Sequence, residues 1–177
     1  MDFGAVLEDL ADFLAERGHL WAVVGGVALA AYGLARTTLD LDIVLDLSAQ
    51  EDLLGFLESR GYTTLHYSAG YSNHRNPDPR WGRIDCVYVK EETSRVLFAG
   101  CRLSQGPRGI EIPLPRPEHL AAMKVLAIKN DPGRIYQDMA DLRYLVALPG
   151  VDRFEVRRYF ERHGLGERFD ELEKTLG

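Results

Sequence analysis

The chain has 177 residues, of which 46% are hydrophobic and 27% charged, a composition typical of a globular domain with its own core. Its formal net charge of −6 argues against a strongly basic surface for nonspecific nucleic-acid binding, although it is compatible with a local basic groove. The two cysteines are too few for a disulfide framework or a zinc site, so we expect reduced thiols in a cytoplasmic protein. We also expect no signal peptide and no membrane span, because the N-terminal stretch is acidic and amphipathic and no apolar run is long enough.

The first part of the chain predicts a helix, a strand and a glycine turn. Apolar residues at helical spacing indicate an amphipathic helix over residues 2–17, and a strand is expected over residues 20–24. Gly25 and Gly26 then form a tight turn before a short helix over residues 27–34. The start of such a helix presents unpaired N–H groups and the positive end of the helix dipole, which suit a phosphate. Because glycine lacks a Cβ, a polyphosphate can approach this backbone closely.

The next strand, expected over residues 39–45, alternates between apolar and acidic side chains. One face carries Leu39, Leu41, Ile43 and Leu45, and the other carries Asp40 and Asp42. Two carboxylates about 6–7 Å apart repel each other unless a cation lies between them. Mg²⁺ prefers such oxygen ligands, so we predict a metal site here. The alternative is an exposed strand whose acids merely keep a sheet edge soluble.

The middle of the chain predicts further elements around a turn-rich segment. Ser48 and Glu51 have the spacing of a capping box at the start of a helix that ends before Gly61. Residues 68–83 are rich in glycine, proline and asparagine and predict an irregular loop. This loop is either a solvated tip or a contact surface for a nucleotide or acceptor, with Trp81 as a stacking face. Strands are expected over residues 62–67, 84–89, 102–104 and 110–112, and the pattern over residues 91–99 does not distinguish a helical turn from a loop.

A helical pattern follows three prolines, Pro113, Pro115 and Pro117. Helices are expected over residues 118–129, 135–147, 152–163 and 167–176. We therefore predict an α/β (α+β) protein with a small mixed sheet packed against helices. The α/β core is expected over residues 1–112 and a C-terminal helical subdomain over residues 113–177.

The pair Gly25–Gly26, followed by Arg36-x-x-x-Asp40-x-Asp42, resembles the minimal nucleotidyltransferases of the DNA polymerase β-like superfamily. The nearest relatives look like the AbiE/AbiG-type toxin nucleotidyltransferases and the aminoglycoside or lincosamide nucleotidyltransferases. The resemblance implies a third catalytic carboxylate on a neighbouring strand, and Asp85 matches that place. It further implies transfer of an NMP from an NTP onto a hydroxyl group, with Mg²⁺ or Mn²⁺ as the cofactor.

The resemblance assigns the candidate site residues to two groups. The catalytic and metal-binding residues are Asp40, Asp42 and Asp85. The nucleotide-binding residues are Gly25, Gly26, Arg36 and Lys124. Lys124 would face the triphosphate, and Asp141 would hold it in position. Arg134, Asp138 and Asp141 are spaced i, i+4, i+7, so the alternative is that they only form salt bridges along a helix. Four alternatives stay open, namely a plain strand–helix turn at Gly25–Gly26, a surface cation at Arg36, a structural, hydrogen-bonded acid at Asp85 and a solvated lysine at Lys124.

The acceptor divides the functional hypotheses. A toxin-like enzyme would modify RNA, tRNA ends or a protein hydroxyl and would have a neutralising, antitoxin-like partner protein. An antibiotic-modifying enzyme would act on an aminoglycoside-like or lincosamide-like molecule, but Val27 stands where those enzymes commonly have a tryptophan. The sequence shows no cluster of basic residues, and this weakens the hypothesis that the acceptor is RNA. Two other classes remain, a nonenzymatic nucleotide-binding or antitoxin-like module on the same fold and a glycosyltransferase that uses Asp-x-Asp to hold a metal and a nucleotide-sugar.

Overall fold

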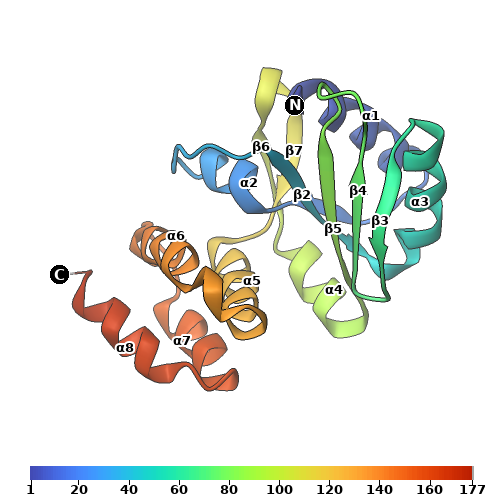
Figure 1. The fold of residues 1–177 in the computed structure, drawn as a ribbon. Coiled ribbons are helices and arrows are strands. Elements are labelled where there is room, and N and C mark those ends of the chain that lie inside the picture. The colour runs from blue at the N-terminus through green and yellow to red at the C-terminus, as the bar shows by residue number, and fades with distance from the viewer. Residues whose placement is uncertain (177) are drawn as a thin grey trace. The chain divides into compact units, whose positions relative to one another are not determined.

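The computed structural model describes residues 1–176 and divides into two compact units, with the division after Pro115. The first unit is built on a five-stranded sheet of order β1-β2-β5-β4-β3, accompanied by a separate two-stranded sheet, β6-β7 (Figure 1). The strands are β1 (Trp21–Val23), β2 (Asp40–Asp46), β3 (Thr63–Tyr67), β4 (Tyr71–Arg75), β5 (Arg83–Val89), β6 (Arg102–Gln105) and β7 (Glu111–Leu114). The helices of this unit are α1 (Phe3–Glu16), α2 (Gly25–Ala31), α3 (Gln50–Ser59) and α4 (Glu91–Ala99).

The five-stranded sheet is mixed, as predicted. β2 and β5 run parallel to each other, whereas the pairs β1–β2, β4–β5 and β3–β4 are antiparallel. In β2 the predicted apolar face is buried, since Leu41, Ile43 and Leu45 are fully buried, but Val44 on the face of the two aspartates is buried as well. Leu39 was wrongly included in this apolar face, since it precedes the strand and is 79% exposed.

The prediction of an irregular loop over residues 68–83 is wrong, because the strand β4 forms within this segment. This strand has no aliphatic residue, yet it lies between β5 and β3 and pairs with both. Its buried polar side chains are satisfied, since Ser72 Oγ lies 2.7 Å from both His74 Nε2 and Tyr88 OH. Thr64 Oγ1 lies 3.1 Å from the other ring nitrogen of His74. These bonds replace the apolar contacts that a sequence pattern would reveal.

The predicted capping box at Ser48 is also wrong. Asp46 is the capping residue instead, and its carboxylate accepts bonds from the Ser48 N–H (2.9 Å) and hydroxyl (2.6 Å). Side-chain hydrogen bonds lower the pKa of the Asp46 carboxyl, and the bond from Ser48 has a larger effect than the bond from Ser94. One turn of 3₁₀ helix, Leu47–Ala49, therefore precedes α3, whose own N-cap Ala49 makes no side-chain bond. The ambiguous segment over residues 91–99 forms the complete helix α4.

The second unit is helical, as predicted, and comprises α5 (Pro117–Asn130), α6 (Ile135–Ala147), α7 (Arg153–Arg162) and α8 (Gly166–Lys174). Asp152 caps α7 by accepting bonds from the N–H groups of Phe154 and Glu155. Buried Phe160 and Phe169 pack edge to face, with ring centroids 5.3 Å apart, and join α7 to α8. Among the described residues, no helix has the length and apolar character needed to cross a membrane.

Candidate active site

The pairing of β2 with β5 gathers the predicted carboxylates on one face of the sheet. Asp42 lies directly opposite Asp85, and Asp40 lies opposite Arg83. Residues that oppose each other on neighbouring strands share a face, as do residues two positions apart on one strand. Asp40, Asp42 and Asp85 therefore belong to one acidic row on adjacent strands. All three are of intermediate exposure, so the row borders solvent.

The predicted glycine turn packs against this row. Gly25 begins α2 with a φ of +60°, a conformation that favours glycine. A Cβ on Gly25 would overlap Asp42 Oδ2, and a Cβ on Gly26 would lie 2.6 Å from Thr38 Cβ. The N–H of Val24, just before the turn, donates to the carbonyl oxygen of Asp42 at 2.9 Å. The absence of side chains at the turn thus lets α2 begin against the Asp42 carboxylate.

Asp85 is held by neighbours on its own face of the sheet. Asn73, its direct partner on β4, donates an amide hydrogen bond to Asp85 Oδ1. Arg83 Nε lies 3.1 Å from the same oxygen. Tyr71 lies on this face as well, and burial, followed by the charge of Asp85, raises the pKa of its hydroxyl. We call Asp85, Arg83, Asn73 and Tyr71 the Asp85 cluster.

The sequence analysis did not identify Asn73 as a site residue. Its contact with Asp85 depends on the pairing of β4 with β5, which lie in a segment expected to be irregular. No apolar alternation marks this segment, because Ser72, Asn73 and His74 are all polar and all buried.

The acidic row is the candidate metal site. The described residues contain no group of three or more His, Cys, Asp or Glu side chains that could hold a metal ion as they are placed. As they are placed, Asp85 is bonded to Asn73 and Arg83, and Asp42 lies against the glycine turn. The donor set consists only of carboxylates, which is the chemistry that a hard cation such as Mg²⁺ requires.

Arg36 lies beside the glycine turn. It lines a cavity of about 320 Å³ together with Gly26 and Thr38, and the rest of the wall comes from apolar residues of α2, from Phe3 and from residues 105–107. None of the three carboxylates lines this cavity. Arg36 is thus near the predicted phosphate-binding backbone.

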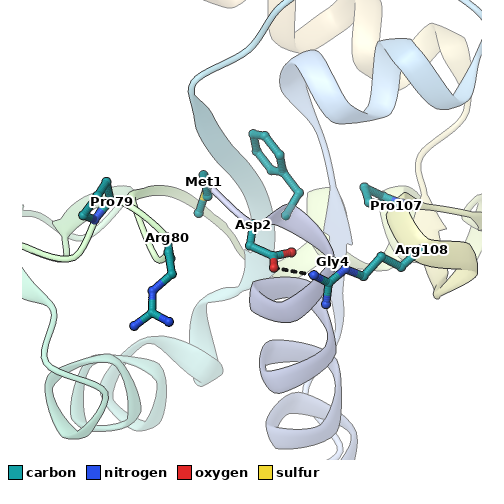
Figure 2. Close-up of a pocket in the computed structure, with 8 residues that line it drawn as sticks. Met1, Asp2, Gly4, Pro79, Arg80, Pro107 and Arg108 are labelled. Carbon is teal, nitrogen blue, oxygen red and sulfur yellow. Dashed lines mark hydrogen bonds and ion pairs between the residues drawn. The ribbon is translucent and has the colours of Figure 1, made fainter.

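A larger cavity, of about 600 Å³, contains none of the predicted site residues (Figure 2). It lies between the start of α1 and two loop segments, and an ion pair between Asp2 and Arg108 forms part of its wall. Asp2 also accepts a bond from the N–H of Ala5 at the start of α1. We therefore assign the charges of this cavity to the structure of the helix end.

Lys124 lies in α5 of the second unit and contacts two acids of α6. Its Nζ is 2.7 Å from Asp138 Oδ1 and 2.7 Å from Asp141 Oδ2. The predicted contact with Asp141 is present, and Asp138 adds a second that was not expected. Arg134 also contacts Asp138, at 3.2 Å. We call Lys124, Asp138, Asp141 and Arg134 the Lys124 cluster.

Comparison with known proteins supports the fold class. No family model matches the chain, and no curated protein matches it in sequence. The solution structure of the antibiotic-resistance factor ANT(2″)-Ia matches 99% of this chain and 98% of its own length, with a TM-score of 0.69 and 16% identity. A nucleotidyltransferase-like protein from Paracoccidioides brasiliensis matches 99% of this chain and 92% of its own (TM-score 0.60, 17% identity). The lincomycin-bound lincosamide adenylyltransferase LnuA matches 80% of this chain and 94% of its own (TM-score 0.53, 17% identity).

These similarities show that the chain has a nucleotidyltransferase fold, as its mixed sheet and helices predict. At such identities the likeness concerns the fold, because one fold can support several functions.

Proposed function

We propose that the protein is a metal-dependent nucleotidyltransferase that moves an NMP from an NTP onto a hydroxyl acceptor. One observation carries the proposal: Asp42 and Asp85 are direct partners on parallel strands, with the Gly25 turn packed against Asp42. Aspartate is a poor strand former. An acidic row within a sheet is therefore costly unless it binds a cation or reacts.

Each part of the row has a role in this reaction. Asp40, Asp42 and Asp85 would hold Mg²⁺, which when bound neutralises charge on the triphosphate and favours ionisation of the acceptor hydroxyl. Asp85 accepts the hydroxyl proton as the acceptor oxygen bonds to the α-phosphorus and the bond to the departing pyrophosphate breaks. Asn73 and Arg83 orient the Asp85 carboxylate. Backbone N–H groups of Gly25 and Gly26 bind phosphate oxygens.

The remaining nucleotide-binding candidates are cations. Arg36, in the cavity beside Gly26, contributes positive charge near the phosphates. Lys124, in the second unit, is our candidate for neutralising the leaving pyrophosphate. The toxin-like version of the proposal adds RNA, tRNA or a protein as the acceptor, a cytoplasmic location and a neutralising partner protein. The alternative version takes a small, aminoglycoside-like acceptor.

A nonenzymatic nucleotide-binding module is the second candidate. The ion pair of Arg83 with Asp85 favours it, because this contact occupies the carboxylate that the reaction needs. Such a module would bind an NTP and release no pyrophosphate.

The test is transfer of label from each of the four α-labelled NTPs, with Mg²⁺ or Mn²⁺, onto total RNA, cell protein and a panel of aminoglycosides and lincosamides. We expect label on one acceptor class and a loss of at least about 100-fold in Asp42→Asn. The matched control is Asp12→Asn, which removes an exposed acid of α1 and should leave the rate unchanged.

The outcomes separate the candidates. Label that persists in Asp42→Asn would contradict the role of the acidic row. NTP binding without transfer to any acceptor would favour the binding module.

A further inference from the structure

A positively charged side chain lies on the same face of the sheet as the acidic row. Arg83 is opposite Asp40 in the pairing of β2 with β5, and it precedes Asp85 by two positions on β5. It therefore shares a face with the carboxylates of both strands. Its Nε lies 3.1 Å from Asp85 Oδ1, the oxygen to which the Asn73 amide also donates. Two donors thus occupy one oxygen of the carboxylate that the proposed reaction uses.

The Arg83 guanidinium interacts with several groups of this face. Burial lowers its pKa, but its hydrogen bond with Asp85, the charge of Asp85, the Tyr71 hydroxyl and the charge of Asp40 together raise it. The guanidinium is therefore charged, and it offsets part of the repulsion between the carboxylates. Arg83 is thus a counter-ion of the acidic row, and its closest contact is with Asp85.

The face stays negative in spite of its arginines. Arg75, the partner of Arg83 on β4, is exposed and lies on the same face. Two guanidinium groups therefore accompany three carboxylates, those of Asp40, Asp42 and Asp85, so these side chains keep a net negative charge at neutral pH. A divalent ion in place of the Arg83 guanidinium would bring more positive charge to the row. Exchange of one for the other is favoured by charge and by the oxygen ligands that Mg²⁺ prefers.

The exposure of the ion pair indicates which partner can move. The Arg83 side chain is 42% exposed, whereas that of Asp85 is 16% exposed. A long side chain at the surface can turn into solvent, and a partly exposed ion pair of this kind contributes little to stability. Asp85 keeps its position, because Asn73 on the neighbouring strand still donates to it. Departure of Arg83 thus frees a lone pair of the Asp85 carboxylate to act as a ligand.

We propose that Arg83 is a positioning residue that holds Asp85 before a metal ion binds and leaves this carboxylate when the ion takes its place. The inference rests on the proposed metal-dependent transfer and adds a step that precedes it. Arg83 limits the repulsion between the carboxylates before the exchange, and Asn73 holds Asp85 after it. A permanent ion pair would instead support the nonenzymatic module, so the behaviour of this one side chain separates the two candidate functions.

The experiment measures the affinity of the full chain for Mn²⁺, without any NTP, from the EPR signal of the free ion. The variants are Arg83→Gln, Arg83→Lys and the matched control Arg75→Gln, which removes the same charge from the same face. Arg75 forms no ion pair among residues 1–176, so its loss leaves the contacts of Asp85 intact. A second control, Arg95→Gln, breaks an exposed ion pair with Glu92 in α4. Thermal unfolding of each protein is recorded with and without Mg²⁺.

We expect Arg83→Gln to bind Mn²⁺ about tenfold more tightly than the wild type, because a charge that competes with the ion is removed. Arg75→Gln should gain less than about threefold in affinity, since the charge that it loses is not paired with Asp85. Arg83→Lys should lie between the wild type and Arg83→Gln, and Arg95→Gln should match the wild type. Mg²⁺ should raise the midpoint of thermal unfolding more in Arg83→Gln than in the wild type.

Two results would overturn the inference. A purely structural ion pair would lower the metal-free midpoint in Arg83→Gln and leave the affinity for Mn²⁺ unchanged. An equal gain in affinity in Arg75→Gln and Arg83→Gln would mean that the general charge of the face, and not an exchange at Asp85, explains the effect.

Failure of this inference differs from failure of the proposed function. Transfer of label by the wild type, with equal Mn²⁺ affinity in the wild type and Arg83→Gln, would keep the enzyme and overturn the exchange. Tighter Mn²⁺ binding in Arg83→Gln, without transfer of label to any acceptor by the wild type, would keep the exchange and overturn the chemistry. Absence of Mn²⁺ binding in both proteins would overturn the exchange and the metal dependence together.

Discussion

The Asp85 cluster and the Lys124 cluster use the same kinds of side chain in different ways. In the Lys124 cluster, one cation lies between two acids, and the side chains of Lys124, Asp138 and Asp141 are only 13%, 0% and 6% exposed. In the Asp85 cluster the carboxylate is 16% exposed, its amide partner is neutral, and its Arg83 partner is 42% exposed. Removing one partner of a buried ion pair is costly because the remaining charge is left unpaired, whereas a carboxylate held by an exposed arginine can exchange that partner. We therefore expect the loss of one partner to destabilise the fold in the Lys124 cluster and to slow the reaction in the Asp85 cluster.

The largest expected effect is on stability and concerns Lys124. Lys124→Met leaves two buried carboxylates close together, so we expect the free energy of unfolding to fall by about 3–5 kcal/mol in urea titrations. The triple variant Lys124→Met, Asp138→Asn, Asp141→Asn removes these charges and should recover much of the loss. Wild-type stability in Lys124→Met would contradict the stabilising role of this ion pair, and slow transfer of label in the same variant would support the role of Lys124 at the pyrophosphate.

An intermediate effect is expected for Asn73, which we regard as a positioning residue. Asn73→Ala removes the amide donor to Asp85, so kcat should fall about tenfold, while KM for the NTP stays unchanged because the glycine turn is intact. Asn73→Ser should restore part of the rate. The control Asn76→Ala removes another buried amide, which bonds to the Arg60 carbonyl, and should alter stability without a selective change in kcat. Equal kcat in Asn73→Ala and the wild type would mean that Asp85 needs no support from β4.

The smallest expected effect comes from His74, on the opposite face of β4. Burial lowers the pKa of His74, so the ring is neutral in the fold and binds a proton more readily when unfolded. Stability should therefore decrease as the pH falls from 7.5 through about 6.5 to 5.5, by at most about 1.4 kcal/mol per pH unit for one proton. Urea midpoints should depend less on pH in His74→Gln than in the wild type. His163→Gln, in the second unit, is the control, and an unchanged slope in His74→Gln would contradict this account.

The parts of the fold that local pattern predicts are those with apolar periodicity. The alternation around Asp40 and Asp42 predicts β2 with its acidic face, and the helices of the second unit follow from their spacing. The mixed sheet packed with helices is confirmed by the structure and its neighbours. The roles of the site residues stay predictions.

The parts that local pattern misses depend on nonlocal pairing. β4 lacks aliphatic residues and is stabilised by its pairing with β3 and β5 and by buried polar hydrogen bonds. Its residues alone therefore predict a loop. Asn73 was missed for the same reason. The error at Ser48 has a different cause, because Asp46 competes for the same backbone N–H and lies at the end of a strand that orients it.

The contact between Gly25 and Asp42 has a consequence for mutagenesis and design. The volume that a methyl group would need at Gly25 is already taken by the Asp42 carboxylate. The position that would bind phosphate and the position that would bind metal are therefore a single steric unit. A variant such as Gly25→Ala would therefore lower nucleotide affinity and metal binding together.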